Sequence, residues 1–129
     1  MDATWFDLAT DARKASNRLV SDNFRSCLSR AYYAAYSKIT HGLAGTPHIT
    51  FPAGQEGPNH PGRLGTGGIR RLIETSMPDM DQSRRVKLSE LIGRLYTLRI
   101  FADSRPSVEV EARDAREAIS IMNTIFDSF

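Results

Sequence analysis

The stretch Arg30-Ala31-Tyr32-Tyr33-Ala34-Ala35-Tyr36 decides the fold, because small residues and tyrosines alternate there inside a longer segment without proline. That segment runs from about residue 22 to residue 43, and alanine is the residue that most favours a helical backbone. Successive residues of a helix are turned by about 100°, so apolar residues at this spacing gather on one side. They are Phe24, Cys27, Leu28, Ala31, Ala35 and Ile39. The sequence therefore predicts a central helix with an apolar face.

The other side of this helix is expected to meet something else. Arg30, Tyr33 and Ser37 fall nearly opposite the apolar face, where they would be left for a loop, a second copy or a ligand. Cys27 is the single cysteine, which excludes an internal disulfide and a multi-cysteine zinc site. Its place on the apolar face predicts a small core residue rather than a nucleophile.

Four further helices are predicted from apolar residues that recur every three or four positions. The first covers residues 5–19, with Asp2 or Thr4 as its N-cap. A short helix includes Ile69 and Ile73, and longer ones run from about 81 to 103 and from about 108 to 126. The apolar stripe of the helix at 81–103 is Leu88, Leu91, Leu95, Leu98 and Ala102.

Between the second and third helices the composition changes sharply. Residues 42–68 hold eight of the nine glycines, four of the six prolines and two of the three histidines, and the third, His41, immediately precedes them. Glycine and proline oppose both helix and strand, so this segment is predicted to be one long loop. Loops of this length in a small domain are usually functional or disordered.

Together these segments predict one all-α domain spanning residues 1–129, built as an up-and-down bundle of four main helices plus a short one. No apolar run reaches the roughly 20 residues needed to span a bilayer, and the first residues are acidic rather than basic. We therefore expect a cytoplasmic protein with no membrane contact. The histidines lack the spacing of metal ligands, so neither a metal nor a cofactor is expected.

Charge leaves two interpretations open. The net charge of +2 is too small to indicate nucleic acid by itself, but basic residues bracket one mid-chain region. They are Arg63, Arg70, Arg71, Arg84, Arg85 and Lys87. This segment either contacts phosphates or is an ordinary solvated face. Arg99 and Asp103, four residues apart beside the leucine stripe, likewise form either a surface salt bridge or part of a ligand site.

Two motifs resemble a known family. The stretch from Arg30 to Tyr36 resembles the signature second helix of the HEPN superfamily (higher eukaryotes and prokaryotes nucleotide-binding domain). Residues 95–103, with Leu98-Arg99 before Ala102-Asp103, are similar to the family's later helix. The resemblance implies a helical domain that commonly forms a homodimer, often with a nucleotidyltransferase-type partner protein in toxin–antitoxin systems. Many members are metal-independent ribonucleases, whereas others bind nucleotides or are non-catalytic.

The chain departs from the catalytic pattern of that family at one residue. Catalytic members carry an arginine, four to six residues, and then a histidine that assists attack by the RNA 2′-hydroxyl. After Arg99 the residues up to Pro106 include no histidine, and Asp103 is a poor substitute because a carboxylate repels phosphate. We therefore keep a non-catalytic interaction domain as the alternative function.

One composite site would restore the chemistry. His60 lies in the long loop, and folding of that loop over the fourth helix would bring His60 to Arg99 and Asp103. Arg30 and Tyr33 would lie nearby, and Arg63, Arg70 and Arg71 would add phosphate contacts. The competing interpretation of His60 is a solvent-exposed loop residue. A third possibility is a purely structural helical subunit, in which Asp103 alone satisfies Arg99.

Overall fold

The fold is all-helical, as predicted. The computed structural model describes residues 4–19, 23–44, 66–77, 80–104 and 110–128. These residues form five helices, and no strand occurs among them. The helices are α1 (Trp5–Leu19), α2 (Phe24–Ala44), α3 (Thr66–Ser76), α4 (Gln82–Ser104) and α5 (Ala112–Asp127).

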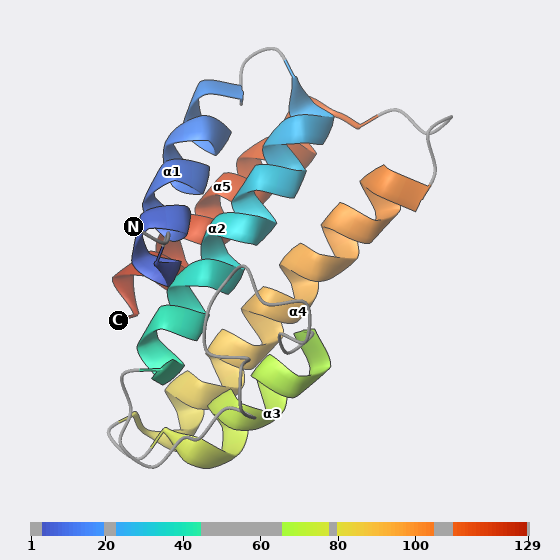
Figure 1. The fold of residues 1–129 in the computed structure, drawn as a ribbon. Helices are drawn as coiled ribbons and strands as arrows, with labels where there is room; N and C mark the ends of the chain where they lie inside the picture. The colour runs from blue at the N-terminus through green and yellow to red at the C-terminus, as the bar shows by residue number, and fades with distance from the viewer. Residues whose placement is uncertain (1–3, 20–22, 45–65, 78–79, 105–109, 129) are drawn as a thin grey trace.

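α2 is the central element of the bundle, because it contacts each of the other four helices. α1, α2, α4 and α5 run alternately up and down, and α3 lies beside the first half of α4 (Figure 1). The second half of α4 extends beyond α3. The bundle therefore has four long helices and one short helix that covers part of one of them.

Short polar residues fix the helix starts. Thr4 caps α1, since its hydroxyl accepts the backbone N–H of Asp7 at 3.1 Å and the Asp7 carboxylate accepts the N–H of Thr4. Asn23 and Asp81 cap α2 and α4 in the same way. At α5, Glu111 and Asp114 form a capping box, so this helix begins four residues later than the predicted position 108.

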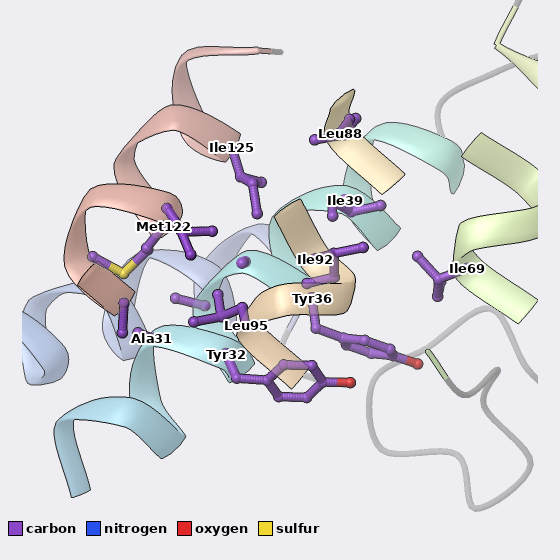
Figure 2. Close-up of a cluster of buried hydrophobic side chains, with 14 of the residues drawn as sticks. Ala31, Tyr32, Tyr36, Ile39, Ile69, Leu88, Ile92, Leu95, Met122 and Ile125 are labelled. Carbon is purple, nitrogen blue, oxygen red and sulfur yellow. The ribbon is translucent and has the colours of Figure 1, made fainter. Parts of the chain in front are cut away.

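The core lies where α2, α4 and α5 meet. Small residues of α2, including Ala31, allow close approach of the other helices, and Leu95 of α4 and Met122 of α5 fill the space between them (Figure 2). Cys27 is fully buried between α1 and α2, which confirms the predicted core role. Burial raises the pKa of its thiol, despite a side-chain hydrogen bond with Ser16 that acts in the opposite direction.

Several boundaries and faces differ from the sequence predictions. The loop predicted at 42–68 is too long at both ends, because Gly42 to Ala44 continue α2 and Thr66 to Gly68 begin α3. The last turn of α2 is held by Leu43, which is completely buried. Residues 45–65 lie outside the described part of the chain.

Neighbouring helices also cover positions that periodicity placed at the edge or on the surface. Ser37 was expected on the outer side of α2 but is fully buried. On α4, Ile92 is completely buried, whereas Leu91 of the predicted stripe is only partly buried. A single apolar stripe cannot describe a helix that has neighbours on more than one side.

Candidate functional site

Arg99 lies at the seam between α4 and α2. Its guanidinium carbon is 4.9 Å from the centre of the Tyr32 ring, within the range of a cation–π contact. Tyr32 is buried and Arg99 is partly buried, so the contact is screened less by water than a surface pair would be. The expectation that Arg99 borders the bundle seam is confirmed.

Two more tyrosines complete this group. The ring of Tyr32 lies 5.7 Å from that of Tyr96 on α4 and 6.0 Å from that of Tyr36 on α2, measured between centroids. Both separations are typical of attractive aromatic pairs. We call Tyr32, Tyr36, Tyr96 and Arg99 the tyrosine–arginine cluster. In Figure 2 the hydroxyls of Tyr32 and Tyr36 point to the same side, away from Met122 and Ile125.

Helix geometry brings the cluster together. Tyr32 and Tyr36 are four residues apart on α2, and Tyr96 and Arg99 are three apart on α4, so each pair shares a helix face. Antiparallel packing of the two helices then places the faces against each other. Chemically, the guanidinium is a planar donor suited to phosphate, and the half-exposed ring of Tyr96 offers a surface on which a base can stack.

The side chains of the other two predicted catalytic residues, Asp103 and His60, lie outside the described part of the structure. Asp103 lies in the last turn of α4, one turn beyond Arg99, as the sequence predicted. His60 lies outside the described residues. The composite site of Arg99, His60 and Asp103 therefore stays a prediction.

The predicted binding residues are spread over the molecule. Arg30 is exposed on α2, and Tyr33 is partly buried against the core. Arg71 is exposed on α3, and Arg63 lies outside the described residues. Arg70 is partly buried, and its Nε donates to the Ser89 hydroxyl of α4 at 3.0 Å. Ser89 precedes Arg99 by ten residues, about 15 Å along the helix, so Arg70 belongs to another site.

A polar group between α3 and α4 has no counterpart among the residues predicted from the sequence. Ser89 is buried, accepts the Arg70 hydrogen bond and donates its own proton to Glu74 Oε1 at 2.6 Å. The one signal in the sequence was the position of Ser89, a polar residue that directly follows Leu88 of the apolar stripe. Periodicity could not identify its partners, because they lie on a different helix.

A second surface lies on the outer side of α4, in its second half. Tyr96, Ile100 and Phe101 are each about 40% exposed there. Beside them is a pocket of about 230 Å³ between α4 and α5. It is lined by Arg94, Thr97, Leu98, Phe101 and Asp114. Large apolar side chains exposed this close together on one helix are typical of an interaction surface.

One ion pair borders this pocket. Arg94 donates two hydrogen bonds to the carboxylate of Glu117, at 2.8 and 3.1 Å. These hydrogen bonds lower the pKa of Glu117 and raise that of Arg94. Both side chains are more than a third exposed, so the pair contributes little stability.

Comparison with known proteins gives no relative: no protein-family model, curated protein or solved structure matches this chain. Among the described residues, no three His, Cys, Asp or Glu side chains gather where they could hold a metal ion. None of the described helices has the length and apolar character needed to cross a membrane. Two features of the described residues bear on function, the tyrosine–arginine cluster and the outer surface of α4.

Proposed function

We propose that this chain is a HEPN-like domain of a cytoplasmic two-gene defence or toxin–antitoxin type system, and that it binds RNA or a nucleotide at the tyrosine–arginine cluster. One observation carries the proposal: the guanidinium of Arg99 is held over the ring of Tyr32, with the half-exposed ring of Tyr96 beside it. The cluster thus combines a phosphate-binding group and a stacking surface at one seam.

The preferred activity is metal-independent cleavage of RNA. Arg99 would hold the scissile phosphate while the neighbouring 2′-hydroxyl attacks phosphorus and displaces the 5′-oxygen. The departing 5′-oxygen takes a proton from water to become a hydroxyl, and the other product ends in a cyclic phosphate. His60 is the residue proposed to take the proton of the attacking hydroxyl, with Asp103 beside the site. Because the reaction uses no metal, cleavage should persist in the presence of a chelator.

The test measures binding and cleavage of single-stranded RNA by the wild type and by Arg99→Gln, in a buffer containing EDTA. Removing the guanidinium should weaken RNA binding by about tenfold or more. Arg116→Gln is the matched control, because Arg116 is an exposed arginine on α5. Equal loss in both variants would indicate only non-specific charge, and unchanged binding in Arg99→Gln would reject the proposed site.

Cleavage is tested separately by His60→Ala. Loss of cleavage with retained RNA binding supports a role for His60 in proton transfer. If His60→Ala and Arg99→Ala both leave cleavage unchanged, the composite site is wrong.

A non-catalytic interaction domain is the second candidate. It is favoured by the absence of histidine after Arg99 and by the exposed side chains of Ile100 and Phe101. In this case the outer surface of α4 would pair with a second copy or with a nucleotidyltransferase-type partner. Sedimentation of the chain alone and with such a partner, combined with the RNA-cleavage assay, distinguishes the two candidates, since this one predicts a stable complex without RNA cleavage.

A further inference from the structure

α3 is attached to α4 by an unusual polar contact. Ser89 is almost completely buried on α4, and its hydroxyl lies between two charged side chains of α3. It accepts a hydrogen bond from Arg70 and donates one to Glu74. We call these three residues the Arg70–Ser89–Glu74 relay. Hydrogen bonds to charged groups are stronger than neutral ones, and their geometry fixes how the two helices sit together.

Gly93 makes room for this relay. A Cβ at position 93 would lie 2.9 Å from one terminal nitrogen of Arg70 and 3.1 Å from its guanidinium carbon. The guanidinium therefore lies directly against the backbone of α4, and a side chain at position 93 would force the end of the Arg70 side chain to move. Glycine is unfavourable inside a helix, so its presence in the middle of α4 has a packing reason here.

Among the described helices, α3 packs only on α4 and α2. Ile69 and Ile73 are fully buried, but Arg71, Glu74 and Thr75 on the same helix are exposed. Ile69 points toward the Tyr36 and Ile92 side of the core (Figure 2). Separation of α3 from α4 would therefore uncover the part of the core next to Tyr36, while the contacts among α1, α2, α4 and α5 remain.

We propose that α3 is a cover that opens away from α4 as a unit, and that the Arg70–Ser89–Glu74 relay sets how often it opens. Opening leaves the four long helices folded and uncovers the apolar surface around Ile92. As a consequence that rests on the proposed function, opening also widens access to the tyrosine–arginine cluster at Tyr36.

Hydrogen exchange of the backbone amides, measured without any ligand, tests the cover independently of the proposed function. Ser89→Ala removes the hydroxyl that joins the two charges and should speed exchange in α3 by about tenfold, with little change in the four long helices. Ser120→Ala, an exposed serine on α5, is the matched control and should leave α3 unchanged.

Gly93→Ala is a second variant, and it should change the exchange rates of α3 and α4 in opposite directions. Alanine favours the helix, so exchange in α4 should slow, while the new Cβ displaces Arg70 and exchange in α3 should become faster. Uniformly faster exchange in all helices after Ser89→Ala would show that α3 unfolds with the core, and this overturns the proposal. Unchanged exchange of α3 in both variants also overturns it.

Discussion

The two halves of α4 differ in what covers their outer side. In the first half, α3 lies over Ser89, Ile92 and Gly93, and even a buried hydroxyl has two partners there. In the second half, Ile100 and Phe101 remain exposed where α3 no longer reaches. Among the described residues, α3 therefore covers the first half of α4, whereas large apolar side chains of the second half stay exposed.

The largest expected effect comes from a matched pair of isoleucines on these two halves. Ile92 is completely buried and Ile100 is 40% exposed. Ile92→Ala should lower the free energy of unfolding by about 3 kcal/mol, because it leaves a cavity in the core. Ile100→Ala should change it by less than about 0.5 kcal/mol. Denaturant unfolding of both variants checks this, and similar costs would mean that the second half of α4 is covered too.

The next prediction concerns association through the exposed half. If this surface pairs with a second copy, replacing Ile100 and Phe101 together by serine should weaken dimerisation by at least about tenfold, since apolar area would no longer be buried. Sedimentation velocity measures the effect. Val86→Ser is the control, because Val86 is equally exposed but lies on the first half of α4. A wild type that is monomeric at tens of micromolar would remove the basis of this prediction.

A smaller effect is expected at the tyrosine–arginine cluster. Tyr96→Ala removes the ring that packs 5.7 Å from Tyr32 and should cost about 1 kcal/mol of unfolding free energy. Tyr96→Phe keeps the ring and should restore most of that loss. Denaturant unfolding distinguishes the two substitutions, and an equal cost for both would show that the hydroxyl matters more than the ring.

The smallest effect involves the ion pair beside the pocket. The lowered pKa of Glu117 means that its stabilising contribution is present above the ordinary value of 4.5 and is lost as the pH falls below it. Both partners are exposed to solvent, so Glu117→Gln should cost only about 0.5 kcal/mol at pH 7. The stability difference between wild type and variant should shrink as the pH falls below 4.5 and should disappear once the carboxylate is protonated in the folded state. A difference that persists there would contradict the ionic explanation.

The sequence was sufficient for the fold class and for the existence of each helix, because apolar spacing and capping residues are local signals. It predicted less reliably which sides of each helix are buried. The leucine stripe predicted one buried side of α4, but α3 also covers Ile92 and Ser89, and that contact depends on how separate segments pack. The same reason explains Ser37, which the periodicity of α2 alone placed on the surface.

For the candidate site, the sequence identified Arg99 and its place at the seam but not its main aromatic neighbour. Tyr32 is 67 residues earlier in the chain, and nothing in local spacing links the two. The predicted positions of His60 and Arg63 depend on residues outside the described part of the structure. Contacts between distant segments follow from packing, which periodicity does not encode.

The single thiol of Cys27 offers a practical consequence of the α1–α2 packing. It is fully buried against Ser16, and its raised pKa keeps it protonated, so an alkylating reagent should react slowly with the native protein. Modification then requires the contact between α1 and α2 to open, locally or with the whole bundle, and the labelling rate reports how often it opens. Cys27 is thus a natural probe on the side of the bundle away from α3. Its rate of labelling reports the opening of the α1–α2 contact without any engineered label.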